Sequence, residues 1–147
     1  MDYKIGKIKK DNINEIVELY IETYKKEPWN ENWEKDIAEN KIRDAIENNL
    51  AENYCIKNDN KIIGIMFGHR CYFIDKKELY IDEYFIDYNY QRKGIGKYFL
   101  ECIENDIKQK NYSNMVLLTK KAFPSELFYK NNGFLTSPNM ILMYKEV

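Results

Sequence analysis

The sequence is poor in the residues that form covalent or metal cross-links. It has one histidine, His69, and three cysteines, Cys55, Cys71 and Cys102, which stand far apart and form no C-x-x-C pair. Disulfide scaffolds and zinc sites need closely spaced cysteines or several cysteine and histidine ligands. We therefore expect neither a disulfide nor a bound metal. Each cysteine has apolar neighbours in the sequence, which predicts three small buried side chains.

Long apolar runs and an excess of one charge are also missing. No stretch approaches the roughly 18 consecutive apolar residues that a membrane-spanning helix needs, and the first residues lack the apolar run of a signal peptide. The 23 Lys and Arg residues are balanced by 24 Asp and Glu residues, for a net charge of −1. Nucleic-acid binding usually requires a basic excess. We therefore expect a cytoplasmic protein with no nucleic-acid or membrane partner.

The chain contains enough apolar material for one domain. Its 147 residues are 44% hydrophobic and 32% charged, a composition typical of globular domains rather than of disordered chains. A domain of about 150 residues buries roughly two-thirds of its unfolded surface. No repeat, low-complexity tract or linker interrupts the sequence, so we expect a single domain over residues 1–147.

Hydrophobic periodicity predicts alternating strands and helices. Apolar residues spaced three and four apart predict helices over 13–24, 33–48, 94–110 and 124–131. Shorter apolar or alternating runs predict strands over 3–8, 53–56, 62–70, 78–87 and 115–119, and a last strand from Phe134 and residues 140–144. The order β-α-α-β-β-β-α-β-α-β predicts an α/β (α+β) fold, with helices on both faces of a mixed sheet.

Residues 79–97 form the most informative segment, because a predicted strand leads through a basic, glycine-containing loop into a predicted helix. This arrangement directs backbone N–H groups and the positive end of a helix dipole toward one point. Gly94 and Gly96 let the backbone approach an anion, and Arg92, Lys93 and Lys97 add positive charge. The spacing fits neither a P-loop nor a Rossmann fingerprint. It predicts a phosphate or pyrophosphate site, although a plain helix start with glycines at the turn has the same pattern.

Two motifs resemble those of the GNAT superfamily of N-acetyltransferases. Gln91-Arg92-Lys93-Gly94-Ile95-Gly96 matches the family signature Q/R-x-x-G-x-G/A. The segment from Leu127 to Phe134 resembles the late Y-x-x-x-G-F block, and one predicted helix and one predicted strand separate the two motifs, as in the family. The resemblance implies the GNAT fold, a mixed and mostly antiparallel sheet of six to seven strands with about four helices on both faces.

The resemblance also implies acetyl-CoA as co-substrate, and the residues that bind it. In the family, backbone amides of the signature loop bind the pyrophosphate of CoA, and the preceding strand contacts the pantetheine arm and the acetyl carbonyl. Phe85 and Ile86 would supply the strand contacts. The loop residues carried over are Gln91, Arg92, Lys93, Gly94, Ile95 and Gly96, with Lys97 close by.

Catalytic residues follow from the same resemblance. Tyr129 matches the late tyrosine that often protonates the departing thiolate, a transfer that a phenol can perform. The family often places a carboxylate on the fourth strand as the base for the amine. Adjacent strand residues face opposite sides, so of Asp82 and Glu83 we favour Glu83, with Asp82 second. The alternatives are that Tyr129 only packs on its helix, and that both carboxylates only attract a cationic substrate.

One part of the family pattern is missing. Many relatives carry N-x-x-A before the late tyrosine, and this chain has Ala122 and Ser125 at those positions. The side-chain amide contact to the pantetheine arm is therefore not expected here. Lys120 and Lys121 instead make this segment basic, which would suit the phosphates of the cofactor or a solvated loop equally.

The resemblance predicts acetyl transfer to a primary amine by direct attack, since no cysteine lies beside the signature strand. Acidic residues and Trp29 and Trp33 in the first helical region favour a small cationic amine, such as a polyamine or an aminoglycoside-like sugar. Alternating Glu and Lys on solvated helix faces would give the same pattern. The alternatives are a protein or peptide N-acetyltransferase and a non-catalytic CoA-binding regulatory module. A homodimer is a further expectation, because dimers are frequent in the family.

Overall fold

The computed structural model describes residues 2–147, which form five strands, four α-helices and two short 3-10 helices. The strands are β1 (Tyr3–Lys7), β2 (Tyr54–Asn58), β3 (Lys61–Phe73), β4 (Lys76–Ile86) and β5 (Asn114–Leu117). The α-helices are α1 (Ile13–Lys25), α2 (Lys35–Glu47), α3 (Ile95–Gln109) and α4 (Pro124–Asn131). The 3-10 helices are η1 (Lys10–Asn12) and η2 (Tyr88–Tyr90).

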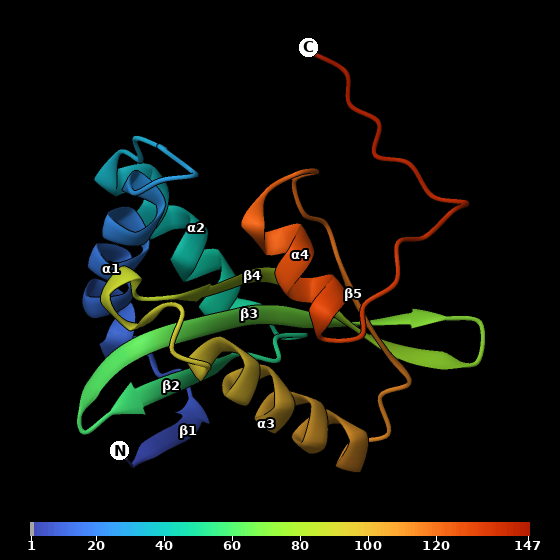
Figure 1. Cartoon of the computed structure of the whole chain (residues 1–147), viewed down its shortest axis with the longest axis horizontal. Helices are drawn as coiled ribbons and strands as arrows, with labels where there is room; N and C mark the ends of the chain where they lie inside the picture. Colours follow the sequence, from blue (N-terminus) through green and yellow to red (C-terminus); the bar gives the residue numbers. More distant parts are fainter. Residues whose placement is uncertain (1) are drawn as a thin grey trace.

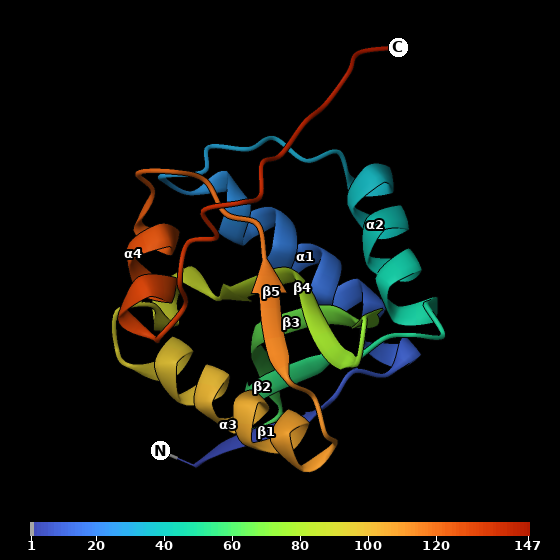
Figure 2. The same ribbon diagram turned by 90° about the vertical axis from the view of Figure 1, so that its right-hand side faces the viewer.

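The strands form one mixed sheet in the order β1-β2-β3-β4-β5. Strands β1 to β4 pair as antiparallel neighbours, and β5 joins β4 in parallel. A parallel pair needs a crossover connection, which α3 supplies. Figures 1 and 2 show α1 and α2 on one face of the sheet and α3 on the other. The predicted mostly antiparallel sheet with helices on both faces is confirmed.

Each face of the sheet carries its own apolar core. On one face, Ile16 and Tyr20 of α1 are fully buried together with residues of α2, β3 and β4. On the other face, Phe99 and Ile103 of α3 are fully buried against β2, β3 and β4. Burying one large apolar side chain stabilises a fold by roughly 1.5–3 kcal/mol, so these contacts hold both helical layers against the sheet.

A β-bulge in β4 changes the direction of its side chains. Phe67 pairs with Glu83 and Gly68 pairs with Ile81, so Asp82 has no partner on β3. An extra residue of this kind shifts the alternation of the side chains beyond it. Ile81 packs in the core beside α3, whereas Glu83, two residues later, receives hydrogen bonds from α1. Without the bulge, both side chains would lie on the same face.

Strands β4 and β5 pair over a short stretch and then separate. Their pairing runs from Glu78 with Asn114 to Ile81 with Leu117, whereas β4 continues to Ile86. The chain after Leu117 leads to α4 instead of following β4. Within the described part of the chain, the last residues of β4 therefore have a neighbouring strand on the β3 side alone.

The hairpin of β3 and β4 is longer than the predicted strands 62–70 and 78–87, because pairing continues to Phe73 and Lys76. Cys71 lies in this extension and is only partly buried, as is Cys102 on α3. Cys55 on β2 is fully buried. The prediction of three buried thiols is therefore correct for Cys55 and wrong for the other two, since apolar neighbours in sequence do not ensure a covering layer.

The predicted last strand does not form, so the sheet has five strands and not six to seven. Residues 135–147 have no regular structure, and Figure 1 shows this segment running away from the body of the molecule. Its large apolar side chains are exposed, including Ile141 at 81% and Met143 at 80%. Alternating apolar residues predict a strand only where a neighbouring strand is available, and this segment pairs with none in residues 2–147.

Candidate active site

The loop between β4 and α3 ends in a left-handed glycine. Gly94 has a φ of 78° and directly precedes Ile95, the first residue of α3. Most side chains at such a φ cost roughly 1–2 kcal/mol. A Cβ atom on Gly94 would meet nothing within 4 Å, so the backbone conformation, and not lack of space, requires glycine here.

The first turn of α3 offers its backbone N–H groups to an anion. No side chain caps this helix, and the first bond of its ladder runs from the amide of Tyr98 to the carbonyl of Gly94. The earlier amides, of Ile95, Gly96 and Lys97, have no intrahelical acceptor. Together with the helix dipole they form the geometry that a phosphate site requires.

Several side chains hold the loop in this shape. Gln91 Nε2 donates to the carbonyl of Ile86 at 2.9 Å, and Lys93 Nζ donates to the carbonyl of Asn89 at 2.9 Å. The Tyr84 hydroxyl donates to the carbonyl of Gly96 and so ties the start of α3 to β4. The side chains of Gln91 and Lys93 are therefore occupied by hydrogen bonds within the loop. A ligand would contact the backbone of these two residues rather than their side chains.

The unpaired edge of β4 runs from this loop toward a buried carboxylate. The amide of Asp87 donates to the carbonyl of Ile63 on β3 at 2.8 Å. Because backbone groups point alternately to the two sides along a strand, those of Ile86 point away from β3 and into the gap beside β5. The neighbouring Phe85 buries its ring in the core under α1.

Glu83 is the centre of a polar cluster beneath α1. Tyr20 donates to its Oε1 at 3.2 Å and Tyr24 donates to its Oε2 at 2.7 Å. Lys41 of α2 places its Nζ 3.1 Å from Oε1, and the Glu83 side chain is 16% exposed. Tyr20 and Tyr24 are one helical turn apart, so both hydroxyls reach the same carboxylate. Such donors are what a largely buried carboxylate needs.

Tyr129 lies close to this cluster. It is buried, borders the same cavity as Glu83, and packs edge-on against Phe134 with the ring centroids 5.2 Å apart. Burial, and then the charge of Glu83, raise the pKa of the Tyr129 phenol well above its usual value. The same two causes raise the pKa of Tyr20 and Tyr24. Tyr129 therefore keeps its proton at neutral pH.

Asp82 has a different partner. Its Oδ2 lies 2.7 Å from Nδ1 of His69, and its side chain is 46% exposed. The imidazole of His69 in turn lies beside the ring of Tyr80, with the centroids 5.5 Å apart. Although Asp82 also borders the cavity, this geometry favours Glu83 as the carboxylate beside a bound amine.

A cavity of about 320 Å³ joins these groups. Its aromatic walls come from Tyr20, Tyr24, Trp29, Trp33, Tyr84 and Tyr129. Trp29 packs against Phe123 with the centroids 5.2 Å apart, which connects the segment between α1 and α2 with the start of α4. Ser125, which stands where many relatives have the alanine of N-x-x-A, also borders the cavity. Its Oγ lies 2.8 Å from Oγ1 of Thr119. Glu31 adds a carboxylate whose Oε2 is buried without a hydrogen-bond partner.

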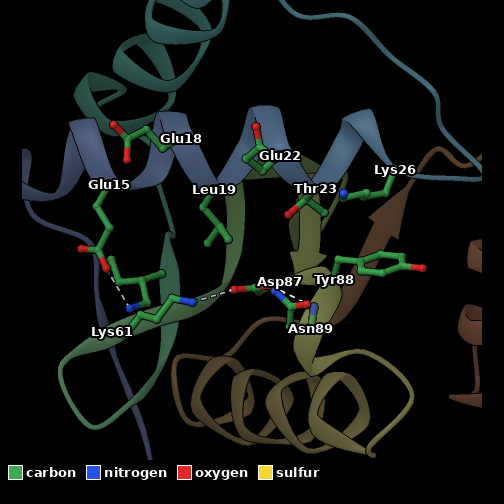
Figure 3. A pocket seen from close by; sticks show the side chains of 11 residues that line it. Glu15, Glu18, Leu19, Glu22, Thr23, Lys26, Lys61, Asp87, Tyr88 and Asn89 are labelled. Carbon is green, nitrogen blue, oxygen red and sulfur yellow. Dashed lines mark hydrogen bonds and ion pairs between the residues drawn. The ribbon is translucent and has the colours of Figure 1, made fainter.

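A larger cavity of about 450 Å³ borders another side of α1 and holds none of the candidate catalytic side chains. Figure 3 shows side chains of α1 facing residues 87–89 across it. Lys61 pairs with Asp87 at 3.0 Å, and Glu15 accepts a hydrogen bond from the amide of Ile62 at 2.9 Å. These contacts tie the start of β3 to α1 and to the loop that leads into α3.

Sequence reasoning did not predict Tyr20, Tyr24 or Lys41 as site residues. Both tyrosines were predicted only as apolar positions of the first helix. Two tyrosines four residues apart on a buried helix face do carry a signal, because each buried hydroxyl needs a partner. Lys41 carries no such signal, since its contact with Glu83 depends on how α2 packs beside β4.

A helix start with amides that lack an intrahelical acceptor, an open strand edge, a carboxylate and a phenol that keeps its proton are the parts that a group-transfer site would need. The chain belongs to the GNAT acetyltransferase family, whose model matches residues 13–134. The predicted family membership is confirmed. No curated protein sequence matches the chain.

Solved structures of similar proteins share the fold. A possible acetyltransferase from Clostridium difficile 630 has a TM-score of 0.85 at 16% identity, with 99% of this chain and 98% of that chain covered. An aminoglycoside N-acetyltransferase in complex with CoA has a TM-score of 0.76 at 12% identity, with 99% and 96% covered. The ribosomal-protein-S18-alanine N-acetyltransferase from Escherichia coli has a TM-score of 0.75 at 14% identity, with 92% and 79% covered.

None of the helices in residues 2–147 is long and apolar enough to cross a membrane. The His, Cys, Asp and Glu side chains of the same residues form no group arranged to hold a metal ion.

Proposed function

We propose that the protein is an N-acetyltransferase that transfers the acetyl group of acetyl-CoA to a primary amine by direct attack. The observation that carries this proposal is the placement of Glu83 and Tyr129 on one cavity, beside the unpaired edge of β4. Membership in an acetyltransferase family supports acetyl transfer. A similar structure described in complex with CoA supports the co-substrate.

The residues present fit acetyl-CoA. The uncapped first turn of α3, from Ile95 to Lys97, suits the pyrophosphate, and the exposed side chain of Arg92 adds positive charge beside it. The backbone N–H of Ile86 points away from β3 and suits the pantetheine arm or the acetyl carbonyl, while the carbonyl of Ile86 accepts from Gln91. By the same alternation the backbone groups of Phe85 point toward β3, which disfavours the predicted contact of Phe85 with the co-substrate. When bound, the co-substrate supplies a thioester carbonyl as the electrophile.

The chain's own residues would handle two protons. An acceptor ammonium has no lone pair, so Glu83 takes a proton from it before the nitrogen attacks. Tyr129 holds a proton that it can give to the departing thiolate. Because the carboxylate and the phenol are both largely buried, the transfers take place in a shielded site where positioning has its greatest effect.

The acceptor that the cavity supports best is a small cationic amine, such as a polyamine or an aminoglycoside-like sugar. Glu31 and Glu83 supply negative charge, and the faces of Trp29 and Trp33 can attract an ammonium group. One similar structure is an aminoglycoside N-acetyltransferase, which agrees with this class without specifying the amine.

Two other functions remain as alternatives. One similar structure is an N-acetyltransferase of a ribosomal protein alanine, so a protein or peptide acceptor is the second candidate. The third is a CoA-binding regulatory module without turnover. The homodimer and the cytoplasmic location stay predictions.

The test is release of free thiol from acetyl-CoA in the presence of polyamines, aminoglycosides, amino acids or short peptides, each compared with a reaction without amine. We expect release with cationic small amines above the amine-free rate. Release with peptides alone would favour the second candidate. A raised melting temperature with acetyl-CoA but no release with any amine would favour the regulatory module.

Tyr129→Phe separates turnover from binding. Removing the phenol proton should lower kcat by about 10²-fold, the lower end of the range for a general acid. The rise in melting temperature with acetyl-CoA should stay the same, because the ring still packs. Wild-type turnover in this variant would contradict the role of Tyr129 as the acid.

A further inference from the structure

Lys41 brings an amine of the chain itself to the proposed base. Its Nζ lies 3.1 Å from Oε1 of Glu83, the oxygen that also accepts a hydrogen bond from Tyr20. The same ammonium lies 5.8 Å from the ring centroid of Trp33, one of the aromatic walls of the cavity. A carboxylate and an aromatic face are the partners that an acceptor ammonium would need. Lys41 therefore has the environment that the proposed reaction assigns to its acceptor.

We propose that Lys41 is a self-acetylation site, at which the chain transfers the acetyl group of its bound acetyl-CoA to its own Nζ. This inference rests on the proposed function, because it uses the same base, acid and thioester. It adds an acceptor of known identity to a reaction whose external amine is defined only by class.

The step balances with groups already described. Glu83 takes one proton from the Lys41 ammonium, and the neutral Nζ attacks the thioester carbon. A C–N bond forms, the C–S bond breaks, and the CoA sulfur leaves with the electron pair and takes a proton from Tyr129. As the amide forms, the second proton of Nζ passes to the Tyr129 phenolate, and Glu83 gives the first proton to solvent. The products are Nζ-acetylated Lys41, free CoA and one released proton.

Lys41 differs from Lys120, the lysine that lines this cavity. The ammonium of Lys120 lies over the rings of Trp29 and Phe123, at 5.7 Å and 5.1 Å. No carboxylate in the described part of the chain forms an ion pair with Lys120. Lys41 does not itself line the cavity, but it contacts Glu83 and Trp33, which do. Lys41 is therefore the lysine whose amine lies against the proposed base.

Acetylation would also change the site. An acetylated lysine carries no positive charge, so its ion pair with Glu83 would be lost. Tyr20 and Tyr24 would remain as donors to the carboxylate. The reaction is therefore expected to stop at one acetyl group per chain, because the modified nitrogen is no longer a nucleophile.

The experiment incubates the purified full chain with acetyl-CoA and no added amine, then measures acetylation of each lysine by mass spectrometry of peptides. Two other lysines are internal controls. Lys120 borders the cavity, and Lys35 is exposed and lies on the same helix as Lys41. We expect Lys41 to react at least about tenfold faster than either, since a positioned base contributes 10²-fold or more. The rate constant should not depend on protein concentration, because the reaction lies within one chain.

Two variants sharpen the test. Glu83→Gln should slow acetylation of Lys41 by about 10-fold or more, while the slow background at Lys35 stays the same. Lys35→Arg, the matched control, should leave the Lys41 rate as it is. Folding of Glu83→Gln is checked by circular dichroism and by its melting temperature. The comparison of Lys41, Lys120 and Lys35 in the wild type needs no variant, so it decides the matter even if that variant fails to fold.

Equal rates at Lys41, Lys120 and Lys35 would overturn the inference, and so would an unchanged Lys41 rate in folded Glu83→Gln. If acetyl-CoA raises the melting temperature and added amines release thiol while Lys41 stays unmodified, this inference is wrong and the proposed function stands. If acetyl-CoA changes neither the melting temperature nor any lysine, both are wrong.

Discussion

At the scale of single residues, the environment of each carboxylate determines its use. Asp82 and Glu83 are neighbours in sequence, yet Asp82 pairs with His69 at the surface and Glu83 is held by two tyrosines in the interior. The bulge at Asp82 produces this difference. The proposed role of base therefore falls to Glu83, which is the more shielded of the two carboxylates and shares its cavity with Tyr129.

Paired substitutions test that assignment. Glu83→Gln keeps the size of the side chain but removes its ability to take a proton, so kcat with an amine acceptor should fall by about 10²-fold. Asp82→Asn should lower it by less than about threefold, since its partner His69 lies outside the polar cluster. Steady-state thiol release measures both. A greater loss in Asp82→Asn than in Glu83→Gln would reverse the assignment.

A second polar cluster joins β1, β2 and α3 far from the candidate active site in sequence. Lys110 lies 3.1 Å from Glu52 and 2.9 Å from Asp106, and Lys7 lies 3.3 Å from Glu52. Burial alone would raise the pKa of Glu52, but Lys110 and Lys7 outweigh it and hold this pKa below its ordinary value of 4.5. The hydrogen bonds from Lys110 and Tyr54 likewise lower the pKa of Asp106.

This cluster predicts a loss of stability in acid. Because the folded-state pKa of Glu52 is depressed, its contribution is present above pH 4.5 and is lost as the pH falls below it. Glu52→Gln should lower the free energy of unfolding by about 1 kcal/mol at neutral pH, and its loss should shrink toward about pH 3. Urea unfolding at several pH values measures this. The exposed Glu18 on α1 supplies the control Glu18→Gln, and equal behaviour of the two variants would contradict the prediction.

At the scale of elements, the start of α3 forms the proposed anion site. The helix begins directly after Gly94, whose left-handed conformation points the first amides of α3 at one spot. Tyr84 fastens this start to β4. The free amides of α3 and the open edge of β4 are therefore held in a fixed position relative to each other.

Gly94→Ala tests the helix start. The added methyl group meets no atom, so the strain of the left-handed backbone is the main effect, roughly 1 kcal/mol. We expect a lower melting temperature and weaker binding of acetyl-CoA, read as a smaller thermal shift. Gly6→Ala is the matched control, because Gly6 also has free space for a Cβ but no positive φ. An unchanged thermal shift in Gly94→Ala would separate this loop from cofactor binding.

At the scale of the whole molecule, one surface is left incomplete. The outer edge of β5 pairs with no strand in residues 2–147, and the segment after α4 exposes Met140, Ile141, Leu142, Met143 and Tyr144. Unpaired edges and exposed apolar segments favour strand addition between chains. Leu142 also borders the cavity, so pairing of this segment would change the access to it.

This surface predicts association that depends on protein concentration. Two chains can pair the segment of one with the β5 edge of the other, which would bury the exposed apolar side chains. The double substitution Ile141→Lys and Met143→Lys should weaken the association, whereas Asn139→Lys, a neighbouring polar position, should not. Sedimentation velocity measures the change. A wild-type protein that stays monomeric over the whole accessible concentration range would contradict the predicted homodimer.

Local sequence signals determined the family, the glycine-containing loop before α3 and the order of the elements up to α4. Helix periodicity, the glycine at the start of α3 and the late tyrosine block act over a few residues, so they are readable without the fold. Tertiary structure decided the rest. Three features depend on residues that are far apart in sequence. They are the bulge that turns Glu83 toward α1, the contacts that Tyr20, Tyr24 and Lys41 make with Glu83, and the missing last strand. Their energies arise only when packing brings them together, since a hydrogen bond or a strand pair needs a partner in space.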